Sequence, residues 1–253
     1  MKQMNMRYLA NNWVPYKLST ENKNNRVRIC GELLAMHRNN DFLNQLVTGD
    51  ELWLYWDNEG VGSRRRSWVA PGGDAPTVPK RTLTCRKHLG TVFWDSKGIL
   101  LFDVLPKNTT MTAAYYCTIL DKLKLSIQEK RRRLMGNGSM NNIFFLNDNA
   151  RPHTARITSE KLREIGFQVL PHPPYSPDLS PSDFYLFSPL KSCLIGKTFD
   201  SSEQLQNHLQ QFIDTKSSKF FRDGIQKLPK RWKKCIGHEG DYFSHLKDDD
   251  FKL

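Results

Sequence analysis

Two aspartates of this chain lie where carboxylates could bind metal ions. Asp148 closely follows an apolar run at residues 143–146, and Asp183 precedes a second apolar segment, with 34 residues between the two. Asp50 lies within a third apolar stretch, residues 45–57. Mg²⁺ prefers oxygen ligands, and two such ions about 3.5–4 Å apart can stabilise the attacking and leaving oxygens of a phosphoryl transfer. We therefore predict that these three aspartates bind two divalent ions.

Asp50 also has a structural interpretation. In a strand it shares a face with Leu52 and Leu54, and a carboxylate in such apolar surroundings is costly unless it is paired or bound to metal. A hydrogen bond to Thr48 or to a backbone amide would satisfy it equally well. The neighbouring Glu51 is expected to point to the opposite face of the strand.

Other polar residues compete for the same role. Asp178 lies in a turn, where it is expected to bond its own backbone. Three side chains near Asp148 could orient metal ligands or make structural hydrogen bonds, namely Asn147, Asn149 and His153. A C-terminal group has metal-binding residue types but fits no standard site: His238, Glu239, Asp241 and His245. The five cysteines contain no Cys-x-x-Cys pair and are expected to be reduced thiols.

The elements that must position Asp50 are strands. Residues 45–57, 89–95 and 99–105 are strand-like, and Ser96-Lys97-Gly98 joins the last two as a hairpin signal. The three strands are expected to pair antiparallel in order. Residues 112–134 then carry apolar side chains at spacings of 4, 3 and 4, which predicts a helix with one buried stripe.

The elements around Asp148 predict a parallel crossover. The wholly apolar run 143–146 is typical of a strand buried on both faces. Pro152 suits the first turn of a helix, Gly166 suits its C-terminal cap, and residues 167–170 form the next strand. An antiparallel meander, a helix, and then parallel strands with helices is the order of the RNase H-like fold. We thus expect an α/β protein with a mixed five-stranded sheet flanked by helices.

The two ends of the chain are expected to be helical. Ser19 or Thr20 can cap a helix, so residues 1–40 are interpreted as an arm with a helix and residues 41–253 as the main domain. Near the C-terminus, residues 205–213 and 219–232 show helical patterns, with Pro229 marking a break. No apolar run approaches the ~20 residues needed to cross a bilayer, so we expect a soluble intracellular protein.

Charge points to a polyanionic partner. The formal net charge is +12, and residues 60–90 contain seven basic side chains against one acidic. Such a segment suits phosphates, because neutralising them releases counterions. A solvated basic loop with no partner is the alternative. The basic residues are Arg64, Arg65, Arg66, Lys80, Arg81, Arg86 and Lys87.

Four motifs together resemble mariner transposases over nearly the whole chain. Residues 13–18, Trp-Val-Pro-Tyr-Lys-Leu, are similar to the family's linker motif, with Tyr16 where His is usual. Residues 48–51 resemble the segment of the first catalytic Asp, and residues 147–153 that of the second, with Asn147 in place of the commoner His. Residues 175–183 resemble the segment of the third catalytic Asp. The 34-residue gap that ends on Asp is the mariner spacing.

The resemblance implies a metal-dependent endonuclease and transposase that acts on transposon ends and target DNA by cut-and-paste transposition. It implies that Asp50, Asp148 and Asp183 are catalytic, that Mg²⁺ or Mn²⁺ is the cofactor, and that the protein is a homodimer working in the nucleus. It further implies that residues 58–88, which include the basic segment, form a clamp loop inserted after the first strand. In the family this loop receives the partner's linker, here carrying Trp13, Val14 and Pro15.

One departure limits the expected activity. Mariner transposases begin with about a hundred residues of helix-turn-helix domains that read the inverted repeats, whereas this chain opens almost at the linker. We expect sequence-specific end recognition to be lost. A truncated or domesticated DNA-binding remnant without catalysis is the alternative function. A cellular RNase H-like nuclease fits the metal site but not the linker and clamp signatures.

Overall fold

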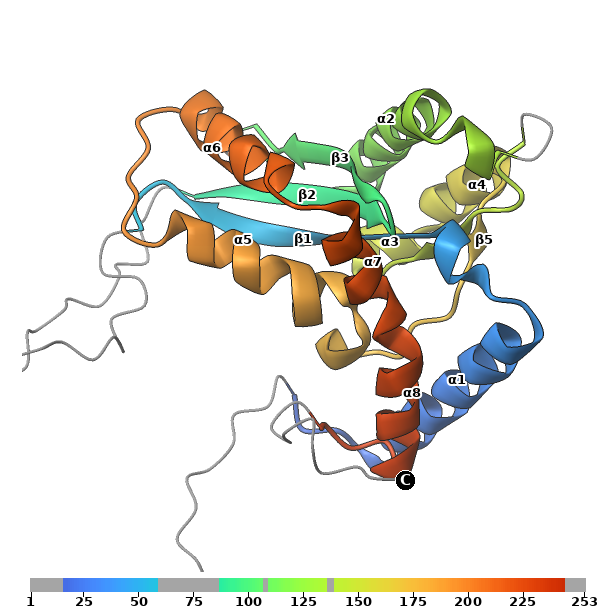
Figure 1. Ribbon diagram of the computed structural model, residues 1–253. Helices are drawn as coiled ribbons and strands as arrows, with labels where there is room; N and C mark the ends of the chain where they lie inside the picture. Colours follow the sequence, from blue (N-terminus) through green and yellow to red (C-terminus); the bar gives the residue numbers. More distant parts are fainter. Residues whose placement is uncertain (1–15, 59–86, 107–108, 136–138, 244–253) are drawn as a thin grey trace, which may run out of the picture.

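The protein is built around one mixed sheet. The computed structural model describes residues 16–58, 87–106, 109–135 and 139–243 (Figure 1). The sheet order is β3-β2-β1-β4-β5, with β1, β2 and β3 antiparallel and with β4 and β5 parallel to β1. The strands are β1 (Leu46–Tyr55), β2 (Lys87–Asp95), β3 (Gly98–Val104), β4 (Phe144–Leu146) and β5 (Gln168–Val169). The expected mixed five-stranded sheet is therefore present.

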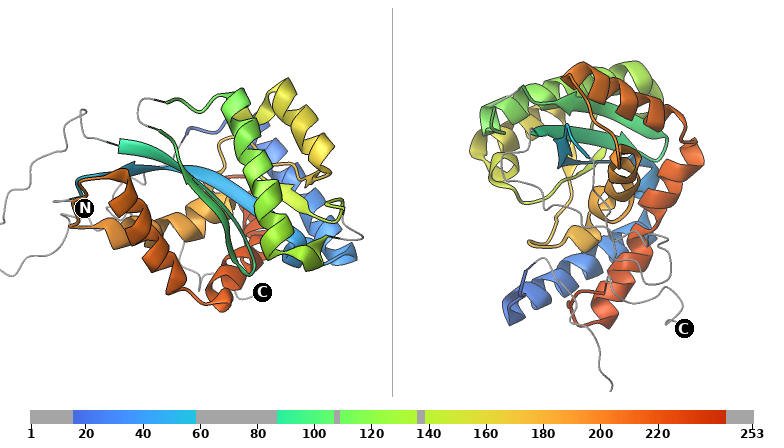
Figure 2. Two further views of the ribbon diagram at one scale, coloured as in Figure 1. Left: turned by 90° about the horizontal axis from the view of Figure 1, so that it is seen from above. Right: turned by 90° about the vertical axis from the view of Figure 1, so that its left-hand side faces the viewer.

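Helices cover both faces of the sheet (Figure 2). The α-helices are α1 (Thr20–Asn39), α2 (Ala113–Lys130), α3 (Arg151–Thr154), α4 (Arg156–Ile165), α5 (Phe187–Leu194), α6 (Ser202–Asp214), α7 (Ser218–Gln226) and α8 (Leu228–Gly237). The short turns of helix are η1 (Phe42–Gln45), η2 (Arg132–Leu134), η3 (Pro177–Leu179) and η4 (Ser182–Leu186). Of these four, η4 is a π-helix and the others are 3-10 helices.

The alternation of side chains along the strands divides the core in two. Val47 on β1 and Phe93 on β2 are buried with α2 and α4, while Leu52 and Trp94 are buried with α5, α7 and α8. This is the period of two expected for a strand with both faces covered. Gly49 precedes Asp50 on β1 and has to lack a side chain, since a Cβ there would overlap the ring of Phe93.

The first helix belongs to this core. Ser19 caps α1 through a capping box with Asn22. Ile29 and Leu33 are buried in the core, and α1 packs along α8 at the bottom of Figure 1. The division into residues 1–40 and 41–253 stays a prediction, although α1 and the domain share one core.

The prediction of a single helix around Pro152 is wrong in one respect, because the structure has two helices there, α3 and α4. Ala155 has a ψ of 148°, which ends α3 and starts α4. The Thr158 hydroxyl donates to the Pro152 carbonyl at 2.6 Å, taking the place of a backbone amide. Gly166 caps α4 with a φ of +97°, as expected. The break turns α3 toward the end of β4.

Part of the predicted site lies outside the described residues. This holds for the linker residues Trp13, Val14 and Pro15 and for Arg64, Arg65, Arg66, Lys80, Arg81 and Arg86. Lys87 is the first residue of β2. Before the undescribed segment, the Asn58 amide donates to the Lys197 carbonyl at 2.9 Å. Within the described ranges, no helix is both long and apolar enough to cross a membrane.

Candidate active site

The three predicted aspartates come together at one end of the central strands. The parallel pairing of β1 with β4 sets Thr48 opposite Leu146, and the Thr48 hydroxyl donates to the Leu146 carbonyl at 2.9 Å. Asp50 and Asp148 each lie two residues further along, so they are at the same level. Asp183 reaches them from η4, which packs against β1.

Asp50 and Asp183 behave as a carboxylate pair. Burial, followed by the negative charges of Asp183 and Asp148, raises the pKa of Asp50 well above its usual value. Burial also raises the pKa of Asp183, although a hydrogen bond with Asp50 opposes the rise. The Ser180 hydroxyl donates to Oδ2 of Asp50 at 3.2 Å. The pair therefore favours holding a proton between its two carboxyls, as expected when like charges meet without a cation.

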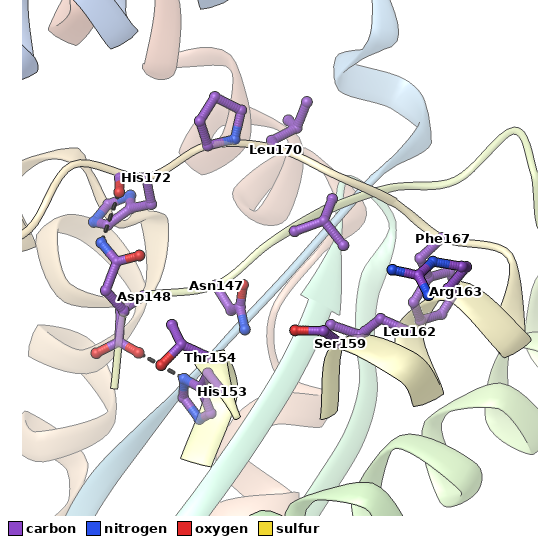
Figure 3. Close-up of a pocket in the computed structure, with 13 residues that line it drawn as sticks. Asn147, Asp148, His153, Thr154, Ser159, Leu162, Arg163, Phe167, Leu170 and His172 are labelled. Atoms are coloured by element: carbon purple, nitrogen blue, oxygen red, sulfur yellow. Dashed lines mark hydrogen bonds and ion pairs between the residues drawn. The ribbon is translucent and has the colours of Figure 1, made fainter. Parts of the chain in front are cut away.

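Asp148 is oriented by different partners. Its Oδ1 accepts the Ala150 amide at 3.0 Å and lies 2.6 Å from Nδ1 of His153 (Figure 3). Burial, the largest single influence, raises the pKa of Asp148, but the hydrogen bonds from His153 and Ala150 together with the charges of His153 and His172 outweigh it, and the net pKa is lowered. Burial lowers the pKa of His153, because it disfavours the imidazolium, yet the contacts with Asp148 and Glu51 and the charges of both carboxylates raise it to about 10. Asp148 is thus ionised, unlike the proton-sharing pair beside it.

Two cavities open beside Asp148. One, of about 480 Å³, is lined by Asp148 and Asp183 together with Tyr175 and Ser180. The other, of about 660 Å³, runs from Asp148 past His153 and α4 to Phe167 (Figure 3). Asp148 therefore borders space large enough for substrate on two sides.

The neighbours of Asp148 show how the site was only partly predicted. Asn149 donates to the His172 carbonyl at 2.7 Å, and Asn147 makes a side-chain hydrogen bond with the buried Tyr116. Both have structural hydrogen-bonding roles, which the sequence had left open. Glu51 does point to the opposite face from Asp50, but it lies 3.3 Å from Nε2 of His153. No pattern in the sequence indicated that contact.

Asp178 was predicted wrongly. It forms a buried ion pair with Arg26, whose Nη1 and Nη2 lie 2.9 and 2.7 Å from its two carboxylate oxygens. It does not simply bond its own turn, since Arg26 crosses from α1 to reach it. The available signal was an arginine on the same helix face as Cys30 and Leu33, both of which are buried.

The described members of the C-terminal group, His238, Glu239 and Asp241, form no metal site. Asp241 pairs with Lys23 at 2.5 Å, and His245 lies outside the described residues. Among the residues that the structure describes, no three His, Cys, Asp or Glu side chains are arranged so that they could hold a metal ion. This includes the three aspartates, because Asp148 faces His153 while Asp50 faces Asp183.

The chemistry of the three aspartates nevertheless fits a divalent cation. They supply carboxylate oxygens, which suit Mg²⁺ and Mn²⁺. They also concentrate negative charge, which raises the pKa of Asp50 and which a cation would neutralise.

Comparisons with known proteins agree with this geometry. The profile of the family Transposase_1, described as transposase (partial DDE domain), matches residues 61–136. The human histone-lysine N-methyltransferase SETMAR is 35% identical over 96% of this chain, and the match spans 35% of SETMAR. The mariner Mos1 transposase of Drosophila mauritiana is 33% identical over 96% of this chain and 69% of its own length. The chain thus spans about a third of one curated relative and two thirds of the other.

Solved structures show the same relationship. A pre-cleavage Mos1 transpososome matches with a TM-score of 0.87 at 34% identity, covering 96% of this chain and 69% of that one. Mos1 paired-end complexes with Mn and with Mg match with TM-scores of 0.86 and 0.85. The fold is RNase H-like, and the protein is a DDE-type transposase domain. More particularly, the chain belongs to the mariner transposases.

Proposed function

We propose that this chain binds divalent cations through Asp50, Asp148 and Asp183 and catalyses the cleavage and strand transfer of DNA in cut-and-paste transposition. The observation that carries the proposal is the convergence of three carboxylates from β1, β4 and η4 with more negative charge than their surroundings balance. Mos1 complexes with Mn and with Mg support divalent metal use. We infer two ions, Mg²⁺ or Mn²⁺, since a pair of ions can stabilise both reacting oxygens.

The residues of the chain have separate tasks in this proposal. Bound ions would activate the attacking water or 3′-hydroxyl and stabilise the charge that develops on the scissile phosphate. Asp50 and Asp183 must release the proton they share before both can act as ligands. The Ser180 hydroxyl keeps Oδ2 of Asp50 oriented. Asp148 is already ionised, and both of its described hydrogen bonds use Oδ1, which leaves Oδ2 for a cation.

The partners follow from the same family relationship. Mos1 structures include paired-end and strand transfer complexes, so we infer that this chain contacts transposon ends and target DNA and works as a homodimer. The basic residues of segment 58–88 would contact DNA or the partner, and Trp13, Val14 and Pro15 would enter the partner's clamp loop. Since chromosomal DNA is the substrate, we infer a nuclear location.

A plasmid-nicking assay tests the proposed chemistry. Supercoiled plasmid is incubated with the chain and with Mn²⁺, Mg²⁺ or a chelator. We expect metal-dependent nicking that Asp148→Ala reduces at least about a thousandfold, because metal ligands supply several kcal/mol of transition-state stabilisation. Asp103→Asn is the matched control, since Asp103 pairs with Lys122 on the surface of the same sheet. Equal nicking by Asp148→Ala would overturn the assignment.

Metal binding distinguishes an enzyme from a remnant. Isothermal titration of the DNA-free chain with Mn²⁺ should give a saturable signal that Asp148→Ala abolishes. A chain that binds plasmid but gives no heat with Mn²⁺ and no nicking would be a non-catalytic DNA-binding remnant. Strand transfer is then measured with pre-cleaved DNA ends, because the match spans 35% of SETMAR and 69% of the Mos1 transposase.

A further inference from the structure

Lys191 lies on the helix that continues from Asp183. The π-helix η4 passes directly into α5 at Phe187, and Asp183, Phe187 and Lys191 are spaced four residues apart, so they follow one side of this continuous helix. Long side chains on a helix lean toward its N-terminus, and the Lys191 Nζ lies 5.8 Å from the centroid of the Phe187 ring. The ammonium group is therefore turned back toward Asp183, which lies one turn before Phe187.

The Lys191 side chain is exposed, and no described carboxylate forms an ion pair with it. Lys219 shows the more usual arrangement, since it is also exposed but lies 2.6 Å from the carboxylate of Asp223. The charge of Lys191 nevertheless acts on the predicted site. Burial, the largest influence, raises the pKa of Asp183, whereas the charge of Lys191 lowers it. Lys191 thus provides positive charge near the carboxylates while its ammonium group stays available to another anion.

A DNA strand needs such a charge in order to lie along the predicted site. The phosphates of DNA and the three aspartates have the same sign, and bound metal ions would neutralise only the phosphate at the reacting position. Each strand carries one phosphate per 3.4 Å of helix axis. Lys191 follows Asp183 by eight residues, which is about 12 Å at 1.5 Å per residue. Its ammonium group can therefore reach a phosphate within about three nucleotides of the metal site.

The far end of α5 adjoins the segment that contains most of the basic side chains predicted to bind DNA. At its near end η4 packs against β1, and beyond its far end the Gly196 amide donates to the Asn58 carbonyl at 3.0 Å. The helix thus extends beside β1 from the carboxylates to the last described residue before segment 59–86 (Figure 1). A DNA strand that contacts both the metal site and that segment would lie beside Lys191.

We propose that Lys191 binds a backbone phosphate of the DNA strand whose scissile phosphate lies at the metal site, and so holds that strand in place for cleavage. The inference rests on the proposed function and adds a DNA contact outside the metal ligands. Lysine meets phosphate as a point charge, so the contact positions the strand without reading its sequence. The competing explanation is that Lys191 only moderates the negative charge around Asp183.

The salt dependence of plasmid nicking tests the contact. kcat/KM with Mn²⁺ is measured between 50 and 200 mM salt for the unaltered chain and for Lys191→Gln. Each phosphate contact contributes about 0.9 to the slope of log affinity against log salt concentration. Over this range Lys191→Gln should therefore lose about three- to fourfold less kcat/KM than the unaltered chain. Lys191→Arg keeps the charge and should keep the full slope.

Lys122→Gln is the matched control. Lys122 is a half-exposed lysine on α2, which packs on the other face of the sheet, so its loss should leave the salt slope unchanged. Isothermal titration of the DNA-free chain with Mn²⁺ separates the two explanations. Lys191→Gln should bind Mn²⁺ as tightly as the unaltered chain or more tightly, because a like charge is removed. Weaker Mn²⁺ binding, or an unchanged salt slope, would assign Lys191 to Asp183 and overturn the inference.

A binding measurement keeps this inference distinct from the proposed function. Fluorescence anisotropy of a short labelled DNA duplex without metal gives the salt slope without cleavage. If the unaltered chain nicks and Lys191→Gln has the same slope in both assays, the function stands and the inference fails. If the unaltered chain binds the duplex but never nicks, the function fails, and equal binding slopes would overturn the inference as well. A smaller binding slope for Lys191→Gln would support the phosphate contact.

Folding of the variants is checked by circular dichroism and thermal melting. Lys191 is exposed, and glutamine has nearly the same helix propensity as lysine, so Lys191→Gln should melt at the temperature of the unaltered chain. If it does not, Lys191→Ala replaces it in every assay, because alanine has the highest helix propensity. The same reduction in salt slope is expected for that variant, and an unchanged slope would overturn the inference.

Discussion

Asp178 and Asp183 lie five residues apart on one loop and have opposite surroundings. Asp178 has 3% of its side chain exposed and is paired with both terminal nitrogens of Arg26, whose side chain is wholly buried. Arg26 also donates to Ser176 at 2.6 Å and to the Gly240 carbonyl at 2.8 Å. Asp183 has no such paired cation: burial raises its pKa, the hydrogen bond with Asp50 and the charge of Lys191 lower it, and the charge of Asp148 raises it further.

The contrast separates a structural carboxylate from a proposed metal ligand. At Asp178 the chain supplies a matching cation, and bidentate geometry fixes it. At Asp183 the chain supplies two further carboxylates, Asp50 and Asp148, and the charge of Lys191 is too small an influence to keep the pKa from rising, so protons or a bound cation complete the balance. The residue type is the same in the two cases, but Asp178 is buried and Asp183 is exposed. A buried matched ion pair distinguishes Asp178, and exposure beside other carboxylates distinguishes Asp183.

The largest expected effect is on stability and concerns Asp178. Asp178→Ala leaves the Arg26 guanidinium buried without its partner, which should cost about 3–5 kcal/mol. For a chain of this size each kcal/mol lowers the melting temperature by roughly 2–4 °C. Thermal and urea unfolding measure the loss.

A second variant shows whether the charge itself is responsible. Arg26→Met combined with Asp178→Leu removes both charges and should recover much of the stability, because apolar replacements of buried pairs are often neutral or better. Asp183→Asn, by contrast, should unfold at the same or a higher temperature than the unaltered chain, since it relieves carboxylate repulsion. Equal destabilisation by Asp178→Ala and Asp183→Asn would remove the distinction between the two regions.

An intermediate effect is expected for His172, which lines the same cavity as Asp148 and Asp183. Burial lowers the pKa of His172 to about 4, whereas an unfolded histidine titrates near 6.5. As pH falls from 6.5 toward 4, the unfolded chain therefore binds a proton that the folded chain does not, and stability is lost. The loss at pH 5 should be about 1–2 kcal/mol.

Urea unfolding of the unaltered chain and of His172→Gln between pH 7.5 and 4.5 measures this effect. The variant should lose less stability over that range. Parallel pH dependences would show that His172 is as easily protonated in the fold as in the unfolded chain.

The smallest effect is expected for an exposed pair on α1. Arg28 and Glu32 lie 2.6 Å apart with 60% and 52% of their side chains exposed. Solvent screens such pairs, so Glu32→Gln should change the free energy of unfolding by no more than about 0.5 kcal/mol. Urea unfolding beside Asp178→Ala provides the comparison. A loss comparable to that of Asp178→Ala would mean that burial does not govern ion-pair strength in this helix.

Local patterns predicted the fold well because the elements follow local rules. Alternation identified β1, and Gly166 marked the end of α4. The spacing of apolar residues identified α2 and α6, and Pro229 lies at the start of α8. The break at Ala155 was missed because it depends on a hydroxyl of Thr158 replacing a backbone donor, which no periodicity reports.

The site was less predictable because its contacts cross the chain. Arg26 and Asp178 are 152 residues apart, so nothing local to Asp178 indicates its partner. Glu51 was placed on the correct face, but its contact depends on how α3 turns at the end of β4. The structure brings Asp50, Asp148 and Asp183 together, while their roles as metal ligands stay a prediction.

The position of β1 at the centre of the sheet has a consequence for folding. Thr48 bonds to Leu146, a partner 98 residues later in the chain, so loop closure makes this pairing slow. During synthesis β1 waits for β4, and the cluster still lacks Asp183 after that. A chain that ends before residue 183 therefore holds the first two aspartates at most. The order of assembly itself delays the proposed metal site until most of the protein exists.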